Sequence, residues 1–325
     1  MKKLLIIALS ALFSLPSFAN ICQINGKTFK CDGNLYVKNG RGWCNGQEIM
    51  PEENSGNVAK NGHNCIIEGS WIWGTVTQTA TSNGIQGSGK TETKQVPIKN
   101  IRKISTSSSG NLFIKQCENP QNCIEMLTVT ADDNILPYLK QDIYGNELTL
   151  RSENNVSFYP QTPIHYHATV KDINNISNSG SMDIQSSYIS TDNLTLKTSA
   201  SGDITIKDLI AKQLIINQAG SSDIKAHINT DKLTVNSESS GDIIIAGNTN
   251  MQAINTSGSG DYKAKQLKSN ISSVKSSGSG DISLTAIEKI TGYSSGSGSI
   301  LYNPQYNPYV DVKKTGSGKL KKSSW

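Results

Sequence analysis

Apolar residues recur along the second half of the chain with a period of 18 to 20 residues. A first column follows the serine- and glycine-rich turns: Ile184, Ile204, Ile224, Ile243, Tyr262, Ile282, Ile300 and Leu320. A second column lies eight residues earlier in each repeat: Ile176, Leu196, Ile216, Val235, Ile254, Val274, Gly292 and Val312. Apolar residues two positions apart, as in Leu194-Thr195-Leu196, are typical of one face of a strand. Each repeat is therefore predicted to hold two short strands joined by a Ser-Gly turn.

One such repeat cannot bury its apolar face alone, whereas stacked repeats bury a continuous core. Eight rungs spaced about 4.8 Å apart form a column about 40 Å long. A helix is excluded, because the spacings of three and four are missing and glycine pairs interrupt most repeats. The pattern predicts an all-β protein with a right-handed parallel β-helix, or β-solenoid, whose rungs of about 20 residues are regular from about residue 170.

The part of the chain ahead of the repeats divides into three segments. Residues 20–73 are predicted to form a small cysteine-containing β module, with turns at Asn25-Gly26, Asn39-Gly40 and Asn45-Gly46. Residues 74–95 are rich in Thr, Ser and Gly and are expected to be a linker. The β-solenoid domain then spans 96–325. Its first part holds strand-like runs at 98–104, 111–115, 124–130 and 147–151, with a short helical turn at 133–139.

Residues 1–19 have the pattern of a Sec-type signal peptide. Two lysines precede an apolar run from Leu4 to Leu15, and Ser17-Phe18-Ala19 forms a small-x-small cleavage site. No later run of 18 apolar residues occurs, so no transmembrane helix is expected. The net charge of +5 falls to +3 when the two lysines leave, and with scattered Lys and Arg this argues against nucleic-acid binding. The mature protein is expected in the periplasm, outside the cell or at its surface.

Six cysteines lie between residues 22 and 123: Cys22, Cys31, Cys44, Cys65, Cys117 and Cys123. An even count in an exported chain indicates disulfides. The last two bracket the five residues from Glu118 to Asn122 between strand-like runs, which predicts a hairpin closed by a Cys117–Cys123 disulfide. The other four allow three connectivities, which stay open. Zinc is disfavoured, because 8, 12 and 20 residues intervene between these successive cysteines, more than in usual zinc pairs.

Six segments carry a resemblance to a known family. They are Val96-Pro97-Ile98, Gly110-Asn111-Leu112, Leu127 to Asn134, Gly145 to Leu150, and the Ser-Gly-Ser-Gly-Asp turns at 257–262 and 277–282. In this order, from about Gly87 to Trp325, the chain resembles the family described as "putative autotransporter adhesin, head GIN domain". The resemblance implies a β-solenoid, a bacterial cell-envelope setting and no established activity, and the family's name suggests adhesion. The cysteine module lies outside it, and the repeats after position 290 are degenerate.

A column of aspartates follows the turns: Asp183, Asp203, Asp223, Asp242, Asp261 and Asp281. Like charges one rung apart repel unless something compensates them. Calcium could do so, since it takes carboxylate and carbonyl oxygens. Calcium-binding β-roll repeats have nine residues, however, whereas the period here is near 20. The sequence therefore favours carboxylates that accept hydrogen bonds from their own turns, with no metal and no cofactor.

Two pairs of side chains remain as candidates for chemistry. His165 and His167 share one face of a strand, but no further ligand lies nearby in sequence, so packed or solvated histidines are favoured over a metal pair. Trp71 and Trp73 could stack on sugar rings. A structural role, closing the small module or capping the solenoid, is the favoured interpretation of the two indoles.

These observations favour an exported, non-catalytic, adhesin-like envelope or surface protein whose partner is a cell-surface glycan or an envelope protein. A carbohydrate-binding module of an envelope complex is the first alternative. A polysaccharide lyase or hydrolase is the second, because such enzymes also use β-helices. An enzyme site of this kind needs convergent carboxylates, or carboxylates together with Arg or Lys. The aspartates here form a regular column, and none of the three arginines lies in the repeats.

Overall fold

The computed structural model describes residues 20–24, 27–31, 35–38, 41–44, 47–50, 66–67, 84–154 and 156–325. The chain divides into two units, Met1–Gly84 and Ile85–Trp325. Signal-peptide residues 1–19, Cys65, Trp71 and Trp73 lie outside the described residues.

The described part of the first unit consists of short strands. They are β1 (Asn20–Ile24), β2 (Lys27–Cys31), β3 (Leu35–Lys38), β4 (Arg41–Cys44), β5 (Gln47–Ile49) and β6 (Ile66–Ile67). β1 pairs antiparallel with β2, and the sheet order of the others is β5-β4-β3-β6. The three Asn-Gly dipeptides of the sequence prediction lie outside the described residues, and the strands on either side of each pair antiparallel.

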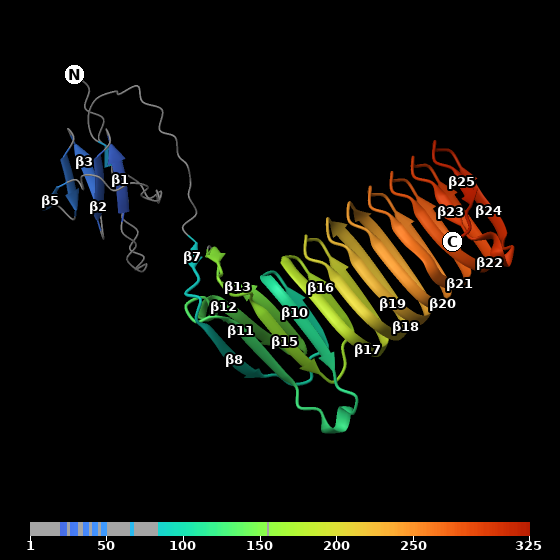
Figure 1. Cartoon of the computed structure of the whole chain (residues 1–325), viewed down its shortest axis with the longest axis horizontal. Helices are drawn as coiled ribbons and strands as arrows, with labels where there is room; N and C mark the ends of the chain where they lie inside the picture. Colours follow the sequence, from blue (N-terminus) through green and yellow to red (C-terminus); the bar gives the residue numbers. More distant parts are fainter. Residues whose placement is uncertain are drawn as a thin grey trace, which may run out of the picture. The chain divides into compact units, whose positions relative to one another are not determined.

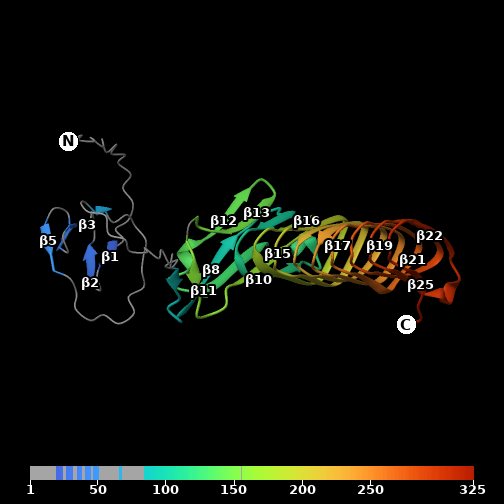
Figure 2. The ribbon, with the colours of Figure 1, turned by 90° about the horizontal axis from the view of Figure 1, so that it is seen from above.

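The second unit is a β-solenoid in which each rung pairs in parallel with the next (Figure 1). Its regular rungs are β17 (Ser181–Thr198), β18 (Ile204–Gly220), β19 (Ile224–Ser239), β20 (Ile243–Thr256), β21 (Tyr262–Ser276) and β22 (Ile282–Ser294). The last rungs consist of β23 (Ile300–Tyr302), β24 (Tyr309–Lys314) and β25 (Leu320–Lys322). Seen from above, these rungs follow one another along a single axis (Figure 2).

The register of the rungs is the one predicted from the apolar columns. Ile204 lies beside Ile184 and Ile224, and the first column continues without a slip to Leu320. The second column pairs in the same way from Ile176 to Val312. From Ile184 to Ile300 the first-column side chains are at most 1% exposed. A slip of one residue would turn every apolar side chain outward, so the pattern alone fixes the register.

Each rung differs from the prediction in one respect. The two short strands expected per repeat are the two halves of one long strand, and only the Ser-Gly turn interrupts it. Pairing continues around the bend within the rung, with small irregularities such as the one between Ile206 and Leu209. Stacked neighbours supply hydrogen-bond partners on both sides, so the backbone can bend without leaving N–H and C=O groups unpaired.

The glycines of the turns are explained by close contact between rungs. A Cβ added to Gly280 would lie 2.0 Å from the carbonyl oxygen of Gly260, and a Cβ on Gly260 would lie 2.0 Å from that of Gly241. These turn glycines do not have positive φ angles. The Ser-Gly repeat is therefore required because the turns stack backbone against backbone, and not because the chain needs a left-handed conformation there.

The first part of the second unit extends the solenoid. Its strands are β7 (Ile85–Gln86), β8 (Thr91–Pro97), β9 (Lys103–Thr106), β10 (Ser109–Gln116), β11 (Met126–Asp132), β12 (Leu139–Tyr144), β13 (Glu147–Ser152), β14 (Phe158–Tyr159), β15 (His165–Val170) and β16 (Asn175–Asn178). β10 pairs in parallel with β17, which places Leu112 beside Ile184. β9 pairs in parallel with β16, which places Ile104 beside Ile176. The predicted helical turn is the 3-10 helix Leu136–Tyr138.

Two features of this region differ from the sequence prediction. β10 and β11 do not form a hairpin, because β15 lies between them, parallel to β10 and antiparallel to β11. The range 74–95, expected to be a linker, contains β7 and the start of β8, which pair with β14 and β11. Polar Thr, Glu, Lys and Gln residues occupy β8 because it is an exposed edge strand.

Candidate functional site

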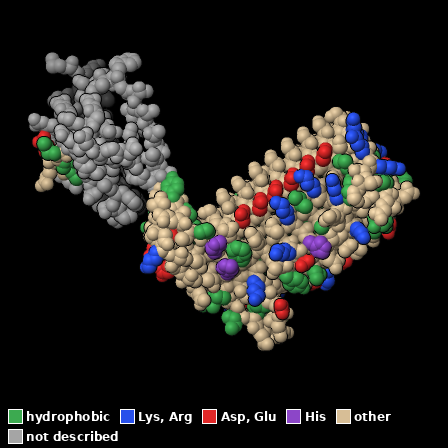
Figure 3. All heavy atoms as spheres, in the orientation of Figure 1, with side chains coloured by type: hydrophobic (Ala, Val, Ile, Leu, Met, Phe, Trp, Pro, Cys, Tyr) green, Lys and Arg blue, Asp and Glu red, His purple; other side chains and the backbone are tan. Residues whose placement is uncertain are grey.

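The six aspartates form a ladder along the solenoid, and acidic side chains are visible as a row in Figure 3. Oδ1 of Asp183 accepts a hydrogen bond from the backbone N–H of Asp203 at 3.0 Å. The same bond recurs at 2.8 to 2.9 Å up the column and ends with Asp281 accepting from Ser299 at 2.7 Å. The carboxylates thus accept from the next rung, and not from their own turns as the sequence suggested.

Lysines beside the ladder offset part of its charge. Lys263 contacts the Asp242 carboxylate and lies 3.5 Å from Oδ2 of Asp261, while Lys225 lies 3.4 Å from Oδ2 of Asp223. Burial raises the pKa of Asp242, but the hydrogen bonds from Lys263 and from the Asp261 N–H outweigh it, and the pKa falls below its ordinary value. Asp242 is thus held ionised by hydrogen bonds and by the neighbouring lysine.

Among the described residues, no three His, Cys, Asp or Glu side chains are grouped as a metal site would require. Along the ladder one oxygen of each carboxylate is already taken by a backbone N–H. A calcium ion normally takes 6–8 oxygen ligands. The geometry of the ladder therefore adds no support to the alternative that the aspartates bind calcium.

The predicted histidine pair lies on the outer surface of β15. The His167 ring stacks on Phe113 of β10, with centroids 4.8 Å apart and planes inclined by 14°. His165 lies 5.9 Å from the same ring, and its Nδ1 is buried without a hydrogen-bond partner among the described residues. The pair is therefore organised around an aromatic ring.

A buried carboxylate that the sequence did not single out closes the first part of the solenoid. Asp132 is fully buried and accepts bonds from the N–H groups of Gly89, at 3.0 Å, and Gln161, at 2.8 Å. Burial opposes its ionisation, but these bonds and those from Thr162 lower its pKa below the ordinary value. The next residue, Asp133, binds Lys90 at 3.1 Å. The sequence placed these residues in the family resemblance and at the start of a short helical turn; in the structure residues 132–134 fasten the 86–90 segment.

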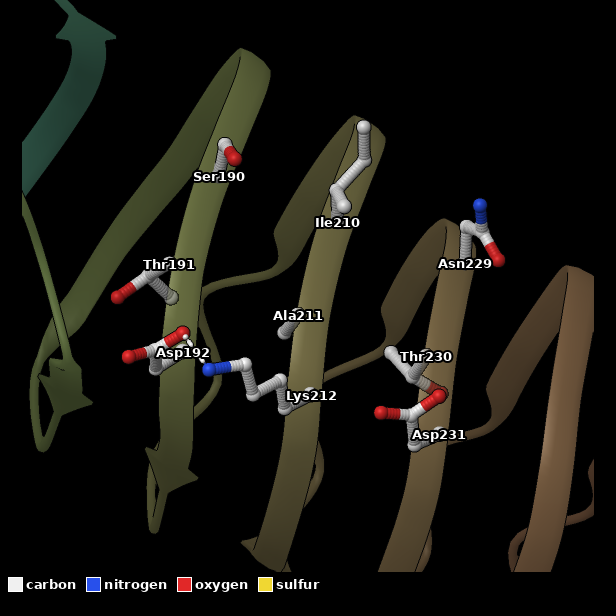
Figure 4. A pocket seen from close by; sticks show the side chains of 9 residues that line it. All are labelled: Ser190, Thr191, Asp192, Ile210, Ala211, Lys212, Asn229, Thr230 and Asp231. Atoms are coloured by element: carbon white, nitrogen blue, oxygen red, sulfur yellow. Dashed lines mark ion pairs between the residues drawn. The ribbon is translucent and has the colours of Figure 1, made fainter.

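A groove of about 420 Å³ lies across the bend of three rungs, lined by Ser190, Thr191, Asp192, Ile210, Ala211, Lys212, Asn229, Thr230 and Asp231 (Figure 4). Lys212 pairs with Asp192 at 2.8 Å, and both side chains are about 70% exposed. A pair this exposed contributes little free energy. No histidine or cysteine lines the groove, and its charged side chains are exposed.

The C-terminal indole docks on the solenoid wall. Nε1 of Trp325 donates to the carbonyl of Lys265 at 3.0 Å, and the Lys265 ammonium lies 5.3 Å from the ring centroid. The ring lines a second groove of about 300 Å³, beside the 3-10 helix Pro304–Tyr306. The tail therefore folds back over two earlier rungs.

The predicted disulfide is present. Cys117 and Cys123 are bonded and join the ends of the segment between β10 and β11, which contains the 3-10 helix Pro120–Asn122. Cys44 is also disulfide-bonded. Nothing is described of the side chains of the other three cysteines or of the two tryptophans, Trp71 and Trp73.

Parallel rungs, Ser-Gly turns and outward polar ladders define the second unit as a β-solenoid of about seven turns. The model of the family "Putative auto-transporter adhesin, head GIN domain" matches residues 121–305, and the chain belongs to this family. A comparison with functionally curated proteins gives no match. No described helix is long and apolar enough to cross a membrane.

Solved structures share the fold. A "putative adhesin" from Bacteroides fragilis NCTC 9343 is 26% identical, with a TM-score of 0.58, over 74% of this chain and 100% of that one. A "putative adhesin" from Parabacteroides merdae ATCC 43184 is 20% identical, with a TM-score of 0.63, over 73% and 99%. A "putative lipid binding protein" from Parabacteroides distasonis ATCC 8503 is 23% identical, with a TM-score of 0.62, over the same shares. The adhesin-like class is thus common to the family model and to two of these structures.

Proposed function

We propose that the protein is exported, non-catalytic and adhesin-like, and that it binds a partner at the cell envelope or cell surface through the outer faces of its solenoid. The observation that carries the proposal is the arrangement of its polar groups in straight columns, one residue per rung. Such columns repeat the same group along the axis, which suits an extended partner. Catalysis needs groups that converge on one reacting atom.

Export and address are tested together on intact cells. N-terminal sequencing of the mature protein is expected to begin near Asn20, after the cleavage site in Ser17-Phe18-Ala19. Proteinase K added to intact cells is expected to degrade the solenoid, while a periplasmic marker survives. An uncleaved N-terminus would contradict export. Protection of the solenoid until the cells are lysed would contradict surface display and leave a periplasmic role.

The binding role is tested with the purified mature protein. Beads coated with it are expected to bind cells or envelope preparations, and beads coated with heat-unfolded protein are not. Incubation with envelope polysaccharides is expected to release no new reducing ends and no unsaturated products. Release of either product would support the alternative of a lyase or hydrolase and would contradict a non-catalytic role.

A further inference from the structure

A second outer face of the solenoid is basic, and we call it the basic face. It is formed by the second half of each rung. There, the outward-pointing residues alternate along the strand with the buried residues of the second column. Pairing lines up one edge column as Lys197, Asn217, Asn236, Asn255, Lys275, Tyr293 and Lys313. The other edge column is Asn193, Gln213, Lys232, Met251, Ile271, Lys289 and Tyr309. A middle column runs between them from Thr195 to Asp311.

The charges of the two faces are opposite. From β17 to β22 the basic face carries four lysines and no acidic residue, a charge of +4. Over the same rungs, the aspartate ladder and its neighbouring column carry six aspartates and two lysines, a charge of 2 − 6 = −4. β24 adds Lys313 and Asp311 to the basic face. The solenoid is therefore polarised across its rungs.

The lysines of the basic face are free to bind an external anion. Lys197, Lys232, Lys275, Lys289 and Lys313 are all exposed. None of them forms an ion pair with a carboxylate of the described residues, whereas Lys212, Lys225 and Lys263 on other faces do. An ammonium group without a carboxylate partner need not break an ion pair when a ligand arrives, so its charge is available for binding.

Aromatic and amide groups accompany these lysines. Tyr309 is 63% exposed and Tyr293 is 42% exposed, and the Lys289 ammonium lies 5.8 Å from the Tyr309 ring centroid. Asn236 and Asn255 each donate a side-chain hydrogen bond at 2.9 Å to the asparagine of the preceding rung. Exposed rings with a polar tip can contact both the apolar and the hydroxyl-bearing sides of a sugar, and the amide ladder adds donors and acceptors.

The geometry of the face suits a polymer. Lys197 and Lys313 stand in one column six rungs apart, or about 29 Å at the usual strand spacing. The two grooves described above are lined by residues outside these columns. We propose that the basic face binds an acidic polysaccharide that lies along the solenoid axis, with its carboxylates or sulfates on the lysines and its rings on Tyr293 and Tyr309. This inference rests on the proposed binding function and names the class of its ligand.

A second copy of the chain, docking through its aspartate ladder, fits the charges less well. Each ladder carboxylate already accepts an N–H from the next rung, and Lys225 and Lys263 lie against three of them. The exposed tyrosines would also have no counterpart there, because the ladder presents carboxylates. A flexible acidic polymer, in contrast, can change its conformation so that its anionic groups reach lysines in different columns.

The test compares two triple variants of the mature protein. Lys275→Gln/Lys289→Gln/Lys313→Gln removes three charges from the basic face. A control set, Lys115→Gln/Lys207→Gln/Lys268→Gln, removes three exposed charges elsewhere. The probes are polygalacturonate and chondroitin sulfate, with neutral dextran and duplex DNA as comparison polymers. We expect the first triple variant to lose at least tenfold in affinity for the acidic glycans, and the control to stay within twofold.

A ring variant separates stacking from charge. Tyr309→Ala is expected to weaken glycan binding severalfold, and Tyr309→Phe to retain most of it. The inference is overturned if both triple variants lose affinity equally, if DNA binds as tightly as the glycans, or if the parent binds no acidic glycan. Salt-sensitive self-association that only the basic-face variant abolishes would assign the face to a second copy. If cell binding persists in that variant, the proposed function stands and only this inference falls.

Discussion

The aspartate ladder gives the sharpest test of how the rungs are held together. Asp203 is the best position, because its Oδ1 accepts the Asp223 N–H at 2.8 Å and its carboxylate forms no ion pair with a described residue. Its own N–H donates to Asp183. We compare Asp203→Asn, which keeps an acceptor oxygen but removes the charge, with Asp203→Ala, which removes both.

The expected magnitudes follow from two opposing effects. Asp183 and Asp223 stand one rung away, and each repels a charge on Asp203 by about 1 kcal/mol at water-like screening. Losing the charge relieves this repulsion, while a hydrogen bond to a neutral amide is weaker by about 1 kcal/mol than one to a carboxylate. Asp203→Asn is therefore expected to match the parent or be more stable by up to about 1 kcal/mol. Asp203→Ala is expected to be about 1–2 kcal/mol less stable than Asp203→Asn, because the Asp223 N–H loses its acceptor.

Thermal unfolding followed by circular dichroism measures the difference. For a domain of this size, 1–2 kcal/mol corresponds to about 3–6 °C in Tm between the two variants. Asp192→Ala serves as the control, because that side chain is 70% exposed and its removal is expected to change stability by less than about 0.5 kcal/mol. If Asp203→Asn and Asp203→Ala melt at the same temperature, the bond between rungs contributes nothing, and our account of the ladder is wrong.

Four further outcomes are expected. Peptide mapping of protein from an oxidising compartment is expected to find Cys117 bonded to Cys123, and reduction to cost about 2 kcal/mol; two free thiols would contradict the structure. Millimolar calcium is expected to leave Tm unchanged relative to a chelator, whereas a rise of many degrees would establish a calcium ladder. Folding lowers the pKa of Asp242, so the stability that this carboxylate contributes is present above its unfolded pKa of about 3.9 and is lost as pH falls through the folded value. In thermal unfolding at acid pH, the Tm of Asp242→Asn is therefore expected to fall less with decreasing pH than the Tm of the parent. Ile204→Asp is expected to cost several kcal/mol and Thr205→Asp about 0.5, and equal urea midpoints would refute the inward assignment.

The sequence by itself determined the solenoid and its register. Side chains of a strand alternate between two faces, so a column such as Ile204, Ile224 and Ile243 can be buried only in one register. The period of 18 to 20 residues then fixes the rung length. The cysteine spacing also identified the Cys117–Cys123 disulfide, because six residues of separation suffice for a local bridge.

Contacts between segments far apart in sequence were decided only by the tertiary structure. β15 lies between β10 and β11. The sequence could not predict this order, because a strand edge can pair with a parallel or an antiparallel neighbour and no local pattern distinguishes the two. Asp132 reaches Gln161, 29 residues away, and the ladder aspartates bond 18 to 20 residues ahead, so neither partner is visible in a local motif. The opposite charges of the two outer faces likewise emerge only when the rungs stack, because residues in one column are a full repeat apart along the chain.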